Sequence, residues 1–102
     1  MNAHVIARIE LYETEHGGRN GPTPSNKFGC LFEGDGEYFD CRLLLEGIGS
    51  LRPGQTATVP ILFLNPDLLR PRLRTSQRFR LWDGKIIADG EIEEIVAANS
   101  GR

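Results

Sequence analysis

The sequence has few of the residues on which catalytic and metal centres depend. It contains two histidines and two cysteines in 102 residues, and none of them stands at the Cys-x-x-Cys type of spacing that binds zinc. It lacks a Gly-x-Ser-x-Gly segment, which would present a serine nucleophile on a sharp turn. It also lacks the Gly-x-x-x-x-Gly-Lys loop that binds nucleotide phosphates. We therefore expect a non-catalytic protein without a metal, a nucleotide or another cofactor.

The histidines and cysteines also lack the neighbours that catalysis needs. His4 lies near the amino terminus, where we expect a surface residue, and His16 falls in a loop. Cys30 and Cys41 lie within apolar segments, where burial opposes the ionisation that makes a thiol a nucleophile. The sequence therefore indicates neither a metal ligand nor a nucleophile among these four residues.

Long hydrophobic runs are absent as well. No apolar stretch approaches the roughly 20 residues that a membrane-spanning helix needs. Residues 1–4 lead directly into a strand-like segment, without the basic start and apolar run of a secretion signal. With so few cysteines, a reducing cytoplasm is the expected location, and no membrane contact is expected.

Neither sign of charge dominates, since the net charge is −2 and the sequence pI is 5.6. Any binding to a polyanion would therefore depend on a local patch. Five arginines fall within eleven residues, whereas glutamates dominate the last strand-like segment. Such an arginine run is more often a solvated face or a set of ion pairs than a polyanion site. The two groups are Arg70, Arg72, Arg74, Arg78 and Arg80, and Glu91, Glu93 and Glu94.

The length and the many turn residues indicate one domain built from short strands, which we place at residues 1–96, with a frayed tail at 97–102. Apolar residues alternate from Val5 to Tyr12, as in a half-buried strand. Residues 13–27 have no periodicity and are rich in glycine and proline, which predicts a loop. A loop of this length in a small domain is usually functional or mobile.

Two apolar segments, 28–33 and 37–45, flank Gly34-Asp35-Gly36 and should form an antiparallel hairpin with a tight turn. If Asp35 and Gly36 are the central turn residues, Cys30 lies directly opposite Cys41. The sequence favours two buried, reduced thiols there, and a disulfide is the alternative. The carboxylates of Glu33, Asp35 and Glu37 should be solvated, because a hairpin tip has no cleft of the kind that glycosidases use.

The second half predicts further strands. Residues 55–64 alternate, but Pro60 removes a backbone donor, which favours an edge strand or a bulge. Residues 65–69 read as a turn or one helical turn that Pro71 would end. Segments 78–82 and 85–95 should pair across Asp83-Gly84. Six antiparallel strands without a long helix indicate an all-β barrel or sandwich.

Five features follow one another along the chain, each common alone but more specific in combination. They are the first strand with Glu10; Gly17-Gly18-Arg19 followed by Thr23-Pro24; the aromatic strand from Phe28 to Phe32; Pro53-Gly54 before a strand; and Arg78-Phe79 through Asp83-Gly84 to Gly90. In this order they resemble the C-terminal β-barrel domain of elongation factor Tu over residues 5–96, which implies a six-stranded antiparallel barrel.

The resemblance implies a domain that does no chemistry. In the full-length factor this barrel packs against the other domains and contacts the T arm of aminoacyl-tRNA. Asp83-Gly84 matches the acidic-glycine turn that lies against that arm, and the loop with Gly17-Gly18-Arg19 matches as well. This chain departs from the family where Asn20-Gly21-Pro22 separates that loop from Thr23-Pro24, and where Glu94 replaces a common lysine.

Two functions remain open at this point. One is a module that contacts structured RNA such as a tRNA arm, which requires the arginine run to share one face with Trp82 and Asp83-Gly84. The other is a protein-interaction module that docks through residues 13–27 or through a barrel edge at Pro60. Trp82 could stack on a base, fill a pocket of a partner or simply cover the barrel end. The candidate binding residues are Gly17, Gly18, Arg19, Arg70, Arg72, Arg74, Arg78, Trp82, Asp83, Gly84 and Lys85.

Overall fold

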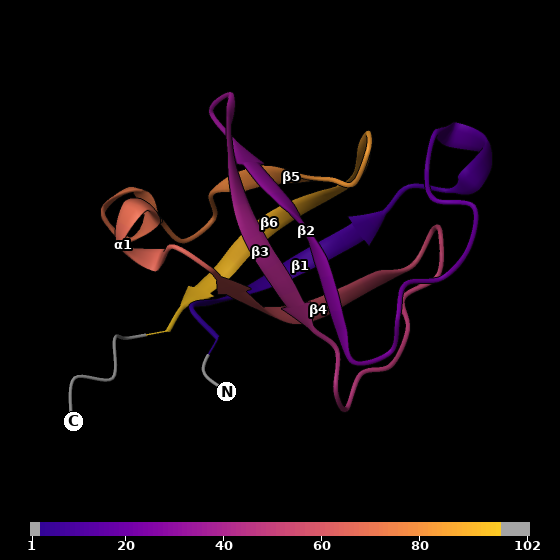
Figure 1. Ribbon diagram of the computed structural model, residues 1–102, viewed down its shortest axis with the longest axis horizontal. Coiled ribbons are helices and arrows are strands. Elements are labelled where there is room, and N and C mark those ends of the chain that lie inside the picture. Colours follow the sequence, from indigo (N-terminus) through magenta and orange to yellow (C-terminus); the bar gives the residue numbers. More distant parts are fainter. Residues whose placement is uncertain (1–2, 97–102) are drawn as a thin grey trace.

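Six strands close into an antiparallel barrel in the computed structural model, which describes residues 3–96 (Figure 1). The all-β, six-stranded barrel expected from the sequence is confirmed, whereas the expected tail at 97–102 lies outside the described residues. Around the barrel the strand order is β1-β4-β3-β2-β5-β6. The strands are β1 (Val5–Leu11), β2 (Lys27–Gly34), β3 (Glu37–Leu44), β4 (Thr56–Phe63), β5 (Arg78–Trp82) and β6 (Ile86–Ile95).

The core lies inside the barrel and follows from the alternation of apolar residues. Every second residue of β1 faces inward and is fully buried, and β4 behaves in the same way from Val59 onward. Three aromatic rings fill the centre: Phe32 stacks on Phe79 at 4.4 Å and meets Phe63 edge-on at 5.0 Å. Gly90 leaves room for this cluster, because a Cβ atom there would lie 2.2 Å from the Phe79 ring.

Both predicted hairpins form. Asp35 and Gly36 adopt φ angles of 53° and 80°, as the tight turn between β2 and β3 requires. Cys30 lies opposite Cys41 as predicted, and the two are free thiols with sulfurs 3.7 Å apart. Their shared hydrogen bond, followed by burial, raises the pKa of Cys41. In the second hairpin Trp82 faces Ile86, so the turn contains residues 83–85 and the last strand begins one residue later than expected.

Pro60 does not mark a free edge, which corrects the expectation from the sequence. Strand β4 pairs with β1 on one side, where Pro60 faces Ile6, and with β3 on the other. The pairing with β3 ends at Ile61, the residue next to Pro60, which has no N–H to continue it. Within residues 3–96, the barrel therefore offers no strand edge at Pro60 for a partner.

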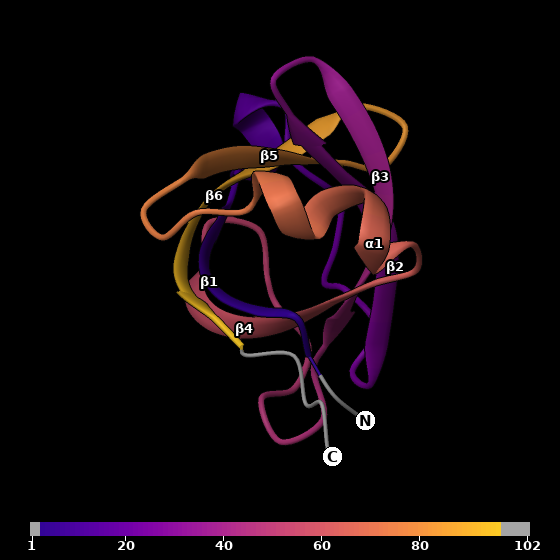
Figure 2. The same cartoon turned by 90° about the vertical axis from the view of Figure 1, so that its left-hand side faces the viewer.

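One end of the barrel is covered by a short helical segment. Helix α1 (Pro66–Leu69) continues into the 3-10 turn η2 (Arg70–Arg72), so Pro71 does not stop the helical path but lies within its last turn. Leu69 and Leu73 of this segment are buried and belong to the hydrophobic core of the barrel. Figure 2 looks at this end and shows α1 lying across part of the ring of strands. We call residues 64–77 the capping segment.

The opposite end carries the 3-10 turn η1 (Thr14–His16), the rest of the loop that joins β1 to β2, and the β5–β6 turn (Figure 1). The two ends of the barrel thus separate candidate residues that are close in the sequence, such as Arg72 and Asp83, and bring together others that are distant, such as Arg19 and Asp83. No helix among residues 3–96 has the length and apolarity needed to cross a membrane.

Candidate functional site

Arg19 ties the long loop to the β5–β6 turn. Its Nη1 donates to Asp83 Oδ2 at 2.9 Å, and its Nη2 and Nε donate to the carbonyl oxygens of Pro22 and Gly21 at 3.2 and 3.3 Å. The guanidinium also lies over the Phe28 ring, 4.8 Å from its centre. The structure thus brings together two candidate features of the sequence, the Gly-Gly-Arg loop and Asp83-Gly84. It does so by internal bonds that use three of the five guanidinium N–H groups, one on each nitrogen, so Arg19 has only two donors left for a phosphate.

The glycine pair beside Arg19 has a structural role. Gly17 has a φ of 93°, and its N–H donates to the Thr14 carbonyl at 3.2 Å. Gly18 donates to the Glu13 carbonyl at 2.9 Å, and a Cβ atom at Gly18 would lie 2.0 Å from the carbonyl oxygen of Tyr12. Both amides are therefore used within the loop. The pair lets two backbone segments approach each other rather than presenting amides to a ligand.

Thr23 fastens the other end of this loop, a role that sequence reasoning missed. Its side chain is almost fully buried, and its hydroxyl accepts a hydrogen bond from the Leu51 N–H at 2.9 Å and donates to the Pro24 carbonyl at 3.0 Å. The Thr23 N–H also donates to the Leu51 carbonyl. The only signal in the sequence was the Thr-Pro pair itself, because nothing in its surroundings indicates burial.

Arg70, Arg72 and Arg74 lie on the capping segment, at the other end of the barrel from the loop and Asp83-Gly84, whereas Arg78 and Arg80 lie on β5, on the same outer face as Trp82 (Figure 1). Arg70 pairs with Asp67 at 3.6 Å, and Arg72 pairs with Glu37 on β3. Arg78 faces Glu91 across the β5–β6 ladder. The structure therefore divides the candidates into two groups. Gly17, Gly18, Arg19, Trp82, Asp83, Gly84 and Lys85 belong to one end, and Arg70, Arg72, Arg74 and Arg78 belong to the end with the capping segment.

Trp82 belongs to an aromatic pair on the outside of the barrel. It is half-buried and meets Tyr38 edge-on, with ring centres 6.3 Å apart. Tyr38, which sequence reasoning did not select, is 52% exposed. The indole is therefore not an isolated surface ring, because it already contacts another aromatic side chain of the protein.

Beside this pair, Glu33 and Arg80 correct the expectation of a fully solvated carboxylate cluster. Glu33 is only 8% exposed, and its carboxylate accepts hydrogen bonds from Arg80 Nε and from the Gly36 N–H, each at 3.1 Å. The hydrogen bond to Glu33 raises the pKa of Arg80. Glu33 thus holds the hairpin turn and β5 together, whereas Asp35 is exposed as expected.

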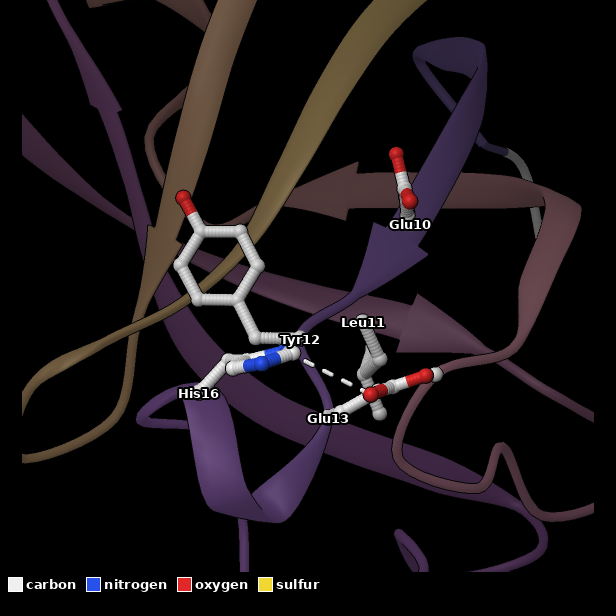
Figure 3. A pocket seen from close by; sticks show the side chains of 6 residues that line it. Glu10, Leu11, Tyr12, Glu13 and His16 are labelled. Atoms are coloured by element: carbon white, nitrogen blue, oxygen red, sulfur yellow. Dashed lines mark ion pairs between the residues drawn. The ribbon is translucent and has the colours of Figure 1, made fainter.

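A pocket of 420 Å³ lies where β1 enters the long loop (Figure 3). His16 and Glu13 form a loose ion pair at 3.4 Å below the Tyr12 ring, and Glu10 stands apart from them. The Tyr12 hydroxyl donates to Asp89, and burial, followed by this bond, raises the pKa of Tyr12. The residues that line the pocket include no serine, threonine, cysteine or lysine. Residues 3–96 also contain no cluster of three or more His, Cys, Asp or Glu side chains suited to a metal.

His4 is not the surface residue that the sequence suggested. It is half-buried beside Phe63, with ring centres 6.0 Å apart, and its Nδ1 accepts a hydrogen bond from the Phe63 N–H at 2.9 Å. Burial, followed by the charge of Arg70, lowers the pKa of His4 below the ordinary 6.5. The neutral ring is therefore the form that suits the folded state.

This arrangement predicts a pH dependence of stability. As the pH falls through about 6.5, His4 takes up its proton first in the unfolded chain, so the contribution of His4 to stability is present above that pH and is lost below it. Denaturant unfolding between about pH 7.5 and 5.5 should show this slope. His4→Asn keeps an acceptor but cannot titrate, and it should flatten the slope, whereas His16→Asn should not. An unchanged slope in the His4→Asn variant would assign the effect to another group.

No protein-family model matches the chain, and no curated protein is significantly similar to it. The resemblance to the elongation factor Tu barrel therefore stays a hypothesis that depends on the motifs of the sequence.

Proposed function

We propose that this protein is a non-catalytic module that binds another protein. The observation that supports this best is the surface of the capping segment. Leu68 is 61% exposed, more than any other large apolar side chain of residues 3–96, and Leu64 before it is 46% exposed. Exposed leucines on a segment whose neighbouring leucines are buried favour contact with an apolar surface, because burying such side chains is favourable.

The alternative, contact with structured RNA, has less support. It required the arginine run to share a face with Trp82 and Asp83-Gly84, but Arg70, Arg72 and Arg74 belong to the capping segment at the other end of the barrel. Only Arg78 and Arg80 lie on the same outer face of β5 as Trp82, and Arg80 is bonded to Glu33. Arg19 donates to groups of the protein itself, and Arg70 and Arg72 are in ion pairs. A net charge of −2 adds no general attraction to a polyanion. The departures from the elongation factor Tu pattern agree with a barrel that has lost its RNA contact.

The experiment is affinity capture of the tagged full chain from its own cells, with and without ribonuclease, compared between the wild type and Leu68→Gln. We expect a protein partner in near-stoichiometric amount that survives ribonuclease and is lost with the variant. Ile48→Gln, a matched change at an apolar side chain that is 40% exposed, should leave capture unchanged. Recovery of RNA alone, together with salt-sensitive binding of a tRNA T-arm minihelix, would replace this proposal by the RNA function.

A further inference from the structure

The charges of this protein are unevenly divided between the capping segment with β5 and the rest of the chain. Residues 64–80 contain five arginines and one acidic residue, whereas the rest of the sequence contains seven basic and 13 acidic residues. This imbalance belongs to the segment rather than to the whole barrel end, because Glu91, Glu93 and Glu94 lie on the part of β6 beside it, where the Ser76 N–H donates to the Ile92 carbonyl. A partner with negative charge would be attracted to the capping segment itself, and this attraction orients the partner during approach.

Within this basic end, two arginines are open to a partner. Arg74 is exposed and makes no ion pair with any of residues 3–96. The ion pair of Arg70 is long, at 3.6 Å, and its partner Asp67 is 97% exposed, so a second carboxylate can replace it with little loss. Arg72 is different, because it pairs with Glu37 and lies over the Phe39 ring, 6.0 Å from its centre. Arg72 therefore holds the segment to β3, and Arg70 and Arg74 remain for binding.

The apolar part of the surface is fixed in place by the same segment. Leu69 and Leu73 are buried in the barrel end, which leaves the neighbouring Leu68 pointing outward. A side chain presented by a segment anchored in this way loses little conformational freedom when it is bound. The end of the barrel thus presents an exposed leucine in a basic setting.

On the basis of the proposed function, we infer that the capping segment docks an acidic protein segment that carries an apolar anchor. The apolar anchor covers Leu68, and carboxylates of the partner pair with Arg70 and Arg74. The partner is a peptide segment rather than a nucleic acid, because Leu68 at this site offers an apolar contact that a phosphate backbone cannot use.

The test uses two synthetic peptides of about 12 residues, with leucines at helical spacing among either Glu and Asp or Gln and Asn. Fluorescence anisotropy measures their binding to the full chain, and amide chemical-shift changes map the site. The acidic peptide should bind, shift amides of residues 64–77 and weaken with salt. Leu68→Gln and Arg74→Glu should each weaken binding by about tenfold, whereas the amide peptide should bind far less.

Two matched control variants test whether a loss of peptide binding is specific to the capping segment. Ile48→Gln alters an exposed apolar side chain elsewhere, and Arg52→Glu makes the same charge change as Arg74→Glu in the exposed turn before β4. Both controls should bind like the wild type, and melting curves should show that all variants are folded. No binding, or shifts confined to the loop of residues 13–26, would overturn the inference. If the peptide failed to bind but the capture experiment still found a ribonuclease-resistant partner, only this inference would be rejected and the proposed function would stand. If peptide binding and capture both failed, both would be rejected.

Discussion

Replacing Gly90 by alanine should lower the free energy of unfolding by about 3 kcal/mol, the upper range for an overpacked core. The added Cβ atom would lie 2.2 to 2.8 Å from three carbons of the Phe79 ring. The ring cannot move freely, because its other face stacks on Phe32. Since Gly90 faces Phe79 across the β5–β6 ladder, the strain would reach both strands. Chemical denaturation followed by circular dichroism would measure the loss.

Gly21 provides the matched control. A Cβ atom there would meet nothing within 4 Å, and its φ is not positive, so Gly21→Ala should be neutral or stabilise by up to about 1 kcal/mol. The double variant Gly90→Ala, Phe79→Leu should recover part of the loss, because the smaller side chain leaves room for the methyl group. A Gly90→Ala variant as stable as the wild type would mean that the aromatic cluster can rearrange around Gly90.

Replacing Arg19 by alanine should lower the free energy of unfolding by about 2 kcal/mol, and Asp83→Asn by less than about 1 kcal/mol. The difference follows from the geometry. The ion pair is partly exposed, with Arg19 at 23% and Asp83 at 44%, so solvent weakens it. Arg19 also donates to the carbonyl groups of Gly21 and Pro22 and lies over Phe28, and Asp83→Asn leaves these contacts intact. Hydrogen exchange should show faster opening of residues 13–26 in the Arg19→Ala variant.

Arg52→Ala is the control for this comparison, since Arg52 is exposed and makes no ion pair with residues 3–96. It should change stability by no more than about 0.5 kcal/mol. If Asp83→Asn were as damaging as Arg19→Ala, the salt bridge, rather than the loop carbonyls, would be the main contribution of Arg19. Equal and small effects would show that the long loop contributes little to the stability of the barrel.

The fold could be predicted because its determinants are local. The alternation in β1, the Asp-Gly turn of the first hairpin and the opposition of Cys30 and Cys41 follow from period, turn type and counting, and all agree with the structure. The assignment of Pro60 to an edge failed for a different reason. Whether a strand has one neighbour or two depends on closure of the whole barrel, which no local pattern reports.

The sequence could predict which residues are candidates for binding, but not which of them lie together in the folded protein. Sequence order placed the arginine run close to Trp82, but α1 and η2 carry Arg70 and Arg72 over one end while β5 runs to the other. The burial of Glu33 and Thr23 was also hidden, because polar residues near a turn or in a loop usually face solvent. Their partners, Arg80 and Leu51, are distant in sequence.

Closure of the barrel also determines when the protein can fold. Strand β1 lies between β4 and β6, and Val5 faces both Ile61 and Ile95, so the first strand is completed by residues from the far end of the chain. Pairings over such long sequence separations are slow to form, typically in milliseconds to seconds for barrels of this kind. During synthesis, β1 can pair with β4 once Ile61 has been made, but its other edge stays open until Ile95 has been made, and in that interval the nascent chain is most exposed to aggregation.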